Sequence, residues 1–136
     1  MYPGMKTTCY CVAVRTAARK TTALYDSMLE PAGVTLAQFS LLRKIERAGS
    51  VSLTKLGQLS ELDRSTIGRN VKALEKLQLV HTASAADQRE AAVSLTSAGE
   101  RALRVGAPLW EKAQRRVETA LGAAGAAQLQ TLALDL

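Results

Sequence analysis

The chain has 136 residues, about the length of one domain. Hydrophobic residues make up 47% and charged residues 22%, close to the averages of folded globular proteins, which argues against disorder. Charges interrupt the apolar runs well before the ~20 residues that a membrane span needs. The N-terminus shows no basic segment followed by an apolar one, as a signal peptide would. We therefore expect a single unit over residues 1–136, located in the cytoplasm and without a membrane partner.

The net charge is positive. Eighteen Lys and Arg residues face twelve Asp and Glu residues, which gives a formal charge of +6. The excess lies in residues 31–80, which hold eight basic and four acidic side chains. A basic chain favours an acidic partner, above all nucleic acid, although an ordinary solvated surface has the same balance.

The residue types that enzymes and metal sites need are scarce. Cys9 and Cys11 are the only cysteines and His81 is the only histidine. These counts exclude a disulfide framework and a four-ligand zinc site. The sequence also lacks a glycine-rich phosphate loop and a pair of carboxylates in a capped site. We expect no catalytic residue, no metal and no cofactor, and hence a protein that is not an enzyme.

The first half of the chain begins with two helices. From Thr8 to Glu30-Pro31 the apolar spacing is helical, with one stripe on a single face (Cys11, Val14, Ala18, Thr21, Tyr25 and Met28). Pro31 ends this helix because it disfavours the helical conformation at the preceding residue. Thr35 and Gln38 form a capping box for a second helix that ends at Ala48-Gly49.

A helix, a turn and a second helix follow. A short helix over residues 53–60 is predicted to turn Leu56 and Leu59 inward. After the turn at residues 61–63, Asp63 caps a longer helix by accepting from the free amides of its first turn. That helix carries one apolar stripe, made of Ile67, Val71, Leu74 and Leu77.

The remainder is predicted as a β-hairpin and a helical C-terminal part. Residues 79–82 and 92–95 are short extended segments joined by a polar tip. Thr96 caps a helix that runs to about Leu121, and Pro108 is expected to kink or break it. Residues 122–125 then separate a last short helix with Leu129, Leu132 and Leu136 on one face. The fold class is mainly α, with a small β-hairpin wing.

Residues 53–95 are the segment that favours a function. Helix, short turn, capped helix and hairpin in this order make a winged helix-turn-helix. The second helix fits the major groove, where Arg binds guanine and Asn binds adenine through two hydrogen bonds each. Its polar side chains could instead be merely solvated, but the order of the elements favours DNA. The candidate contacts are Arg64, Ser65, Thr66, Arg69, Asn70 and Lys72.

The sequence resembles the multiple-antibiotic-resistance regulator (MarR) family of winged-helix transcription factors. The resemblance rests on GVTLAQFSLLRKIERAG (33–49), SLTKLGQLSELDRSTIGRNVKALEKLQLV (52–80), DQRE (87–90) and VSLTSAGE (93–100). It implies a DNA-binding region over residues 35–95, with a recognition helix at 64–77, and dimerisation helices at 8–31 and 97–136. Asp87 and Arg89 match the D-x-R of the family's wing, where the Arg enters the minor groove and the Asp orients basic side chains. Further basic residues usual in that wing are missing here.

The first helix is similar to that of the organic-hydroperoxide sensors in this family. Cys11 falls on the position of their peroxide-reactive cysteine, and Tyr25 matches one of the tyrosines that hydrogen-bond its thiolate. The second tyrosine position is Leu36, and no cysteine lies near the C-terminus to form an intersubunit disulfide. The alternative is that Cys11 is a small apolar residue in a dimer-forming stripe.

The resemblance further implies an effector pocket between the first two helices and the long fifth helix. The candidate residues are Arg15, Arg19, Phe39, Arg43 and Trp110. A cation there would suit an aromatic carboxylate. Solvated arginines, ion pairs between subunits and a tryptophan packed in the core are the alternatives.

The leading interpretation is a homodimeric regulator of transcription, a repressor that binds a pseudo-palindromic operator in double-stranded DNA. A small aromatic or amphipathic effector would release it. One alternative is a regulator that senses oxidants through Cys11. The other is an adaptor that binds a ligand or a protein but not DNA, although an adaptor would not need the basic front of residues 64–72.

Overall fold

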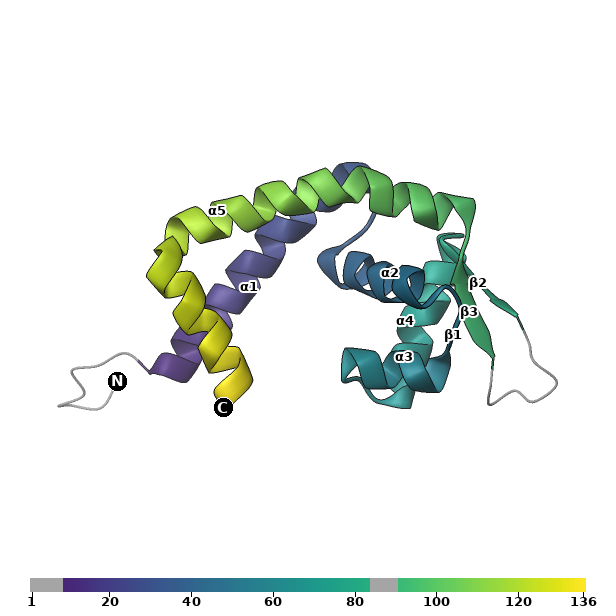
Figure 1. The fold of residues 1–136 in the computed structure, drawn as a ribbon, viewed down its shortest axis with the longest axis horizontal. Helices are drawn as coiled ribbons and strands as arrows, with labels where there is room; N and C mark the ends of the chain where they lie inside the picture. The colour runs from purple at the N-terminus through teal and green to yellow at the C-terminus, as the bar shows by residue number, and fades with distance from the viewer. Residues whose placement is uncertain (1–8, 84–90) are drawn as a thin grey trace.

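A computed structural model describes residues 9–83 and 91–136 of the chain. The elements follow the order α1 (Tyr10–Leu29), a 3-10 turn (Glu30–Ala32), α2 (Leu36–Ala48), β1 (Val51–Ser52), α3 (Leu53–Ser60), α4 (Arg64–Lys76), β2 (Val80–Ala83), β3 (Ala92–Leu95) and α5 (Ser97–Asp135). In Figure 1 most of α1 and the end of α5 form an arm on one side, while α2, α3, α4 and the strands gather on the other. The predicted class, mainly α with a small β part, is confirmed.

Three helices begin at the capping residues that the sequence predicts. The Thr35 hydroxyl accepts from the Gln38 amide at 3.2 Å, and the Gln38 side chain accepts from the Thr35 amide at 3.0 Å. The Asp63 carboxylate accepts from the Thr66 amide at 2.8 Å, and the Thr96 hydroxyl accepts from the Gly99 amide at 3.0 Å. Each bond satisfies an amide in a first helical turn, where no backbone partner exists.

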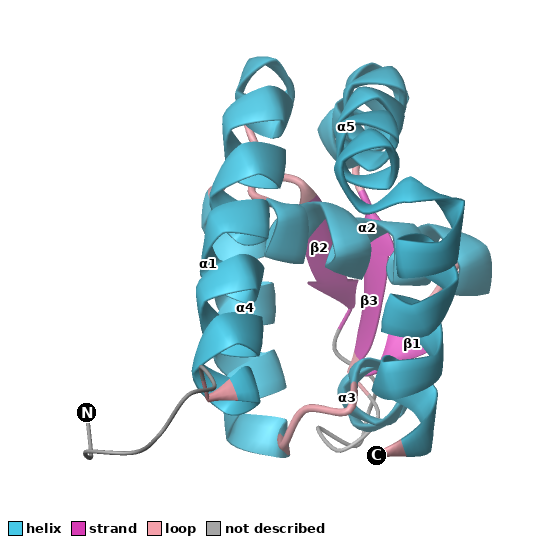
Figure 2. Cartoon of the chain, turned by 90° about the vertical axis from the view of Figure 1, so that its left-hand side faces the viewer, coloured by secondary structure: helices cyan, strands magenta, loops and turns pink. Residues whose placement is uncertain are grey.

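The strands form one antiparallel sheet in the order β1-β3-β2. Val80 faces Leu95 and Ala83 faces Ala92 across the predicted hairpin, while Val51 of β1 pairs with Val93 on its other side. Figure 2 shows β3 between the two outer strands. The segment 51–52, expected as an extended link, therefore anchors the wing to the helical part.

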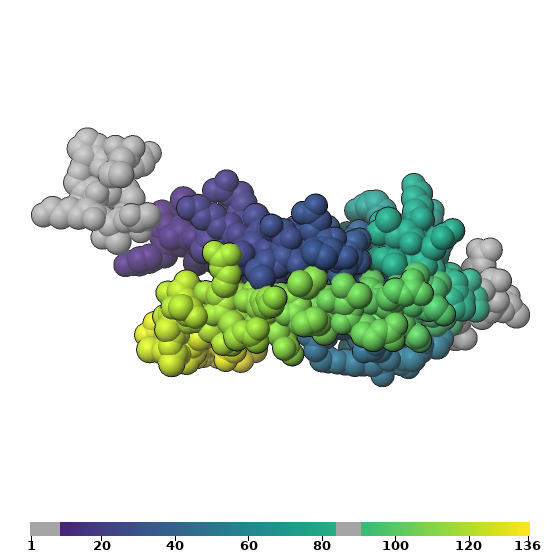
Figure 3. Space-filling model, turned by 90° about the horizontal axis from the view of Figure 1, so that it is seen from above, coloured from purple at the N-terminus to yellow at the C-terminus, as the bar shows by residue number. Residues whose placement is uncertain are grey.

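The core joins α2, α3, α4, the sheet and the first part of α5. Its fully buried large side chains come from several elements: Leu29, Phe39, Leu42, Ile45, Leu56, Ile67, Leu74 and Val93. Burying side chains of this size stabilises a fold by about 1.5–3 kcal/mol each before entropy is counted. Seen from above in Figure 3, α5 runs along the molecule from the wing end towards the arm.

Two leucines expected in the core are exposed instead. Leu59 is 46% exposed because α3 turns its other side inward. On that side Gly57 is buried, and a Cβ placed on it would lie 3.5 Å from the Ile67 side chain. Leu77 is 48% exposed because the chain reverses at Gln78, with φ 60°, and Leu79 enters the core in its place. In both cases the last leucine of the predicted apolar stripe lies outside the core.

The break in α5 lies at Gly122 and not at Pro108. The helix continues through Pro108, and its non-helical residue is Gly122, with φ 73° and ψ 168°. Pro108 and Arg104, whose carbonyl loses its partner, both lie on the exposed side, where water can serve that carbonyl. The predicted interruption at Pro108 is wrong, whereas the separation of a final helical segment after residue 122 is confirmed.

None of the helices within residues 9–83 and 91–136 combines the length and the hydrophobicity that a membrane span requires.

Two glycines bring α5 close to α2 and to the chain segment before β2. A Cβ at Gly99 would lie 2.1 Å from the carbonyl oxygen of Leu79, which also accepts from the Thr96 amide at 3.1 Å. A Cβ at Gly106 would lie 2.8 Å from the ring of Phe39. These glycines are required because the helix packs directly on backbone and ring atoms there.

We expect Gly99→Ala to lower the free energy of unfolding by about 1–3 kcal/mol, because the methyl group collides with a backbone oxygen that cannot move freely. Gly68→Ala in α4 is the matched control, since a Cβ there meets no atom within 4 Å. This control should be neutral or stabilising by up to about 1 kcal/mol. Urea unfolding measures both, and equal stabilities of the two variants would contradict the close contact.

The Asp63 cap makes stability depend on pH. The hydrogen bonds from the Thr66 backbone, the Thr66 side chain and the Ser65 hydroxyl lower the pKa of Asp63 below its ordinary value of 3.8. The contribution of this carboxylate is therefore present above that value and is lost as the pH falls through the lowered pKa. Asp63→Asn keeps a capping oxygen at every pH.

We expect wild type to lose stability relative to Asp63→Asn as the pH is lowered from about 7 to about 2.5, and Asp63→Ala to be less stable than both near neutrality. Thermal melts of the three proteins across this range provide the measurement. Parallel pH profiles for wild type and Asp63→Asn would show that the carboxylate cap has no such role.

Candidate nucleic-acid interface

The helix-turn-helix consists of α3, a three-residue turn and α4. Glu61 ends α3 with a left-handed φ of 54°, and the Leu62 amide donates to the Gly57 carbonyl at 3.0 Å. Ile67, Val71 and Leu74 are buried and hold α4 against the core. The opposite side of α4 is consequently presented to solvent along its length.

Four of the predicted contact residues on α4 are exposed, namely Arg64, Ser65, Arg69 and Lys72. Two hydroxyls hold the arginines. The Arg64 guanidinium donates to the Thr54 hydroxyl of α3, and the Arg69 guanidinium donates to that of Thr66, both at 3.5 Å. The Thr54 contact joins residues ten apart, and nothing in the sequence pattern pointed to it.

Asn70 has a different environment from Arg69. It is half-buried and lines a small hollow of about 170 Å³ between α4 and α2, together with Thr35, Gln38 and Leu41. Arg69 lies about 100° away around the helix, on the outward side. Thr66 is also half-buried. Arg69 and Asn70, both predicted to contact DNA, therefore face in different directions.

The wing is tied to α4 at its base. The Thr82 hydroxyl of β2 donates to the Glu75 carboxylate of α4. On the same hairpin His81 Nε2 lies 3.2 Å from the Ser94 hydroxyl, on adjacent strands. The Thr82–Glu75 hydrogen bond was not predicted from the sequence because it joins two elements that a turn brings together. Asp87 and Arg89, predicted to form the D-x-R of the wing, lie outside the described residues.

Three of the five predicted effector-site residues line one cavity between α2 and α5. Phe39, Arg43 and Trp110 surround a space of about 210 Å³, whose lining also includes Glu46 and Glu111. The Arg43 guanidinium carbon lies 5.9 Å from the centre of the Phe39 ring and 5.1 Å from that of the Trp110 ring. Both are cation–π distances.

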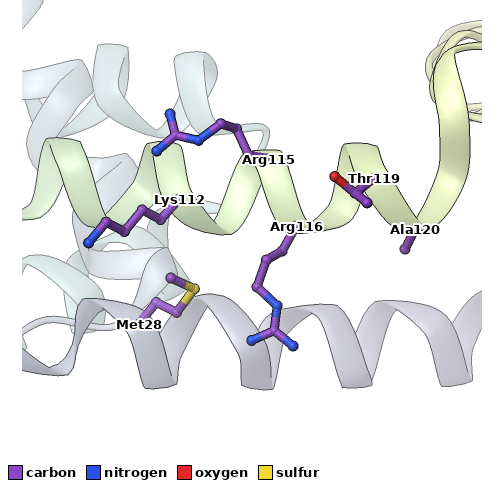
Figure 4. A pocket seen from close by; sticks show the side chains of 6 residues that line it. All are labelled: Met28, Lys112, Arg115, Arg116, Thr119 and Ala120. Carbon is purple, nitrogen blue, oxygen red and sulfur yellow. The ribbon is translucent and has the colours of Figure 1, made fainter.

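Arg15 and Arg19 are not part of that cavity. They are exposed on α1 and line a separate hollow with Val12 and Thr16. A third cavity, of about 520 Å³, lies between α1 and α5 and is lined by Met28, Lys112, Arg115, Arg116, Thr119 and Ala120. Figure 4 shows Lys112 and Arg116 reaching from α5 towards the helix of Met28, whereas Arg115 points away.

Tyr25, predicted as a partner of Cys11, is engaged by α5. Its buried hydroxyl donates to the Gln114 side chain. Burial, and secondarily the Glu118 carboxylate, raises the pKa of Tyr25, so it stays a neutral donor. Cys11 is exposed fourteen residues earlier, about 21 Å along α1. Within one chain these two side chains do not meet.

Comparisons with known proteins agree with this geometry. A family model described as "MarR family" matches residues 34–91. The transcriptional regulator MosR of M. tuberculosis, solved in complex with DNA, is 33% identical, and the match covers 85% of this chain and 84% of that one with a TM-score of 0.75. A mutant MarR of E. coli complexed with operator DNA has 23% identity, a TM-score of 0.79 and coverages of 88% and 87%, and shows the shared fold.

Among curated proteins, the uncharacterised HTH-type transcriptional regulator YhbI of Bacillus subtilis is 29% identical over 103 residues, which are 69% of this chain and 67% of the relative. These relatives are regulators of transcription and not enzymes. With its capped recognition helix, three-stranded wing and long α5, the chain belongs to the MarR family of winged helix-turn-helix transcriptional regulators.

Proposed function

We propose that the chain is a homodimeric repressor that binds a pseudo-palindromic operator in the cytoplasm. One α4 helix would enter the major groove of each half-site, about one DNA turn from the other. The observation that carries this proposal is the exposed basic face of α4, whose arginines are held by threonine hydroxyls. The DNA-bound state of the M. tuberculosis relative supports it.

Within this proposal the residues of α4 have different tasks. Arg69 projects from the middle of the outward face and contacts a base, with guanine the preferred partner. Arg64, Ser65 and Lys72 hold phosphates, which adds affinity without sequence preference. Thr66 positions Arg69, and half-buried Asn70 has the lesser role. Arg89 is proposed as the minor-groove contact of the wing, with Asp87 orienting basic side chains.

The division of the chain follows from what each part leaves exposed. Residues 35–95 bind DNA, and residues 8–31 with 97–136 form the dimer. Apolar side chains of the arm are exposed in a single protomer, among them Tyr10, Val12, Val14, Leu121, Leu129, Leu132, Leu134 and Leu136. So many apolar side chains are covered in a stable protein by another surface. The surface that we propose to cover them is a second copy of the same arm, as in most symmetric homo-oligomers.

Release from DNA is proposed to follow effector binding between α2 and α5. Phe39, Arg43 and Trp110 form the walls of that cavity, which lies where the DNA-binding part meets the helix of the arm. A ligand there shifts the spacing of the two α4 helices only by its differential affinity for the two arrangements. Arg15 and Arg19 stay candidates only for a separate contact on α1.

Oxidation of Cys11 is the second candidate for the switch. Its exposure favours reactivity with peroxide. The Tyr25 hydroxyl, however, already donates to the Gln114 side chain. To donate to a Cys11 thiolate it would have to lose that hydrogen bond, and the thiolate would have to come from a partner subunit. Effector binding is therefore the preferred mechanism.

We expect Arg69→Ala to weaken operator binding by about 1–3 kcal/mol and to relax the preference at one base pair. Asn70→Ala is the matched neighbour and should have a clearly smaller effect, because Asn70 faces α2. Fluorescence anisotropy on the intergenic DNA beside the gene, and on single-base variants of the bound site, measures both. Affinities within threefold of wild type for both variants would mean that α4 does not contact bases.

Removal of residues 123–136 should abolish the dimer and leave monomer or aggregate, because it deletes the exposed leucines of the last helical segment. Leu132→Glu should weaken the dimer in the same direction, whereas Gln130→Glu, with the same added charge at an exposed polar position, should not. Light scattering with size exclusion distinguishes the species. A truncated dimer that still binds the operator would overturn this assignment.

A further inference from the structure

The cavity between α2 and α5 contains a positively charged side chain of the protein itself. The guanidinium of Arg43 lies over the rings of both Phe39 and Trp110, at 5.9 Å and 5.1 Å from their centres. Phe39 is 2% exposed and its ring is fixed against Gly106, where no side chain could fit. Two ring faces are thus presented to one positive charge, an arrangement that stabilises a cation by its attraction to the π electrons.

The other charged residues of this cavity also favour a positive ligand. Glu46 and Glu111 are its other ionisable lining residues, so two carboxylates accompany one guanidinium. The cavity between α1 and α5 is the opposite case, since Lys112, Arg115 and Arg116 line it and none of the described residues in its lining is acidic (Figure 4). An anion would prefer the α1–α5 cavity, and the α2–α5 cavity is built for a positive ligand.

We propose that the effector cavity between α2 and α5 takes a small aromatic cation, an amidinium or ammonium group on a single ring system, which replaces the Arg43 guanidinium between Phe39 and Trp110. This ligand class deepens the proposed effector function and depends on it. It also reverses the aromatic carboxylate that the arginines suggested in the sequence, because Arg43 occupies the aromatic slot itself and Glu46 and Glu111 stand beside it.

The size of the cavity sets the size of the ligand. About 210 Å³ is below the 300–1,000 Å³ range that suits drug-sized molecules, so a one-ring cation fits before the walls move. Displacement of Arg43, which is half-buried, adds the volume of its side chain. Because α2 and α5 both contribute walls, the displaced arginine and the new ligand act at the contact between the DNA-binding part and the helix of the arm.

The test uses two probes of similar size and opposite charge, benzamidine and benzoate, with the full chain. Trp110 is the only tryptophan, so its fluorescence reports on this cavity alone. We expect saturable quenching by benzamidine and none by benzoate. Arg43→Ala should tighten benzamidine binding about two- to fivefold because the competing cation is removed, and Glu111→Gln should weaken it by a similar factor. Lys112→Gln, in the α1–α5 cavity, is the control and should leave benzamidine binding unchanged.

Each other outcome has a distinct meaning. Quenching by benzoate that Arg43→Ala abolishes would overturn the ligand class and leave the effector site standing. Benzamidine binding that neither Arg43→Ala nor Glu111→Gln alters would place the ligand elsewhere and overturn the inference. No response to either probe in any variant would overturn the inference, while the proposed effector cavity would be judged separately by its effect on operator binding. Benzamidine binding that leaves operator affinity unchanged would keep the ligand class but refute its role as a release signal.

Discussion

The close packing of α5 on the DNA-binding part is the contact on which the rest of the structure depends. Gly99 and Gly106 lie seven residues apart, on the same side of the helix, and allow it to touch the Leu79 carbonyl and the Phe39 ring. Since α5 continues from there into the arm, this one contact sets how α4 is held relative to the arm. The aromatic cavity exists because Phe39 is seated against Gly106 on one side and Trp110 follows one turn later.

Two further bonds join the arm to the same framework. The Asp26 carboxylate of α1 accepts from the Leu36 amide at the start of α2 at 2.7 Å, and Tyr25 donates to Gln114 of α5. Together with the buried Leu29 side chain, they fix the end of α1 between α2 and α5. A ligand that moves α2 against α5 would act on a junction of three helices, which gives a physical route from the cavity to the spacing of the two α4 helices in the proposed dimer.

Local chemistry explains why the helix starts could be predicted and some inward positions could not. Thr35, Asp63 and Thr96 cap helices through bonds to residues three positions ahead, so sequence spacing contains the whole interaction. Leu59, Leu77 and Pro108 were misjudged for the opposite reason. Whether a leucine at the end of a stripe is covered, or a proline is tolerated on an exposed side, depends on which neighbouring element lies there.

The sequence by itself determined the class of protein, the order of its helices and strands, and the helix proposed to contact DNA, because capping bonds, apolar periodicity and the motif of residues 52–80 act over short stretches of chain. Only the tertiary structure decided that Arg69 faces outward while Asn70 faces α2, that Arg43 lies over the rings of Phe39 and Trp110, and that Arg15 and Arg19 are separate from them. Apart from the Arg43–Phe39 pair within α2, those facts join residues of different elements that are far apart in the sequence, and their energies exist only once the backbone has brought the elements into contact.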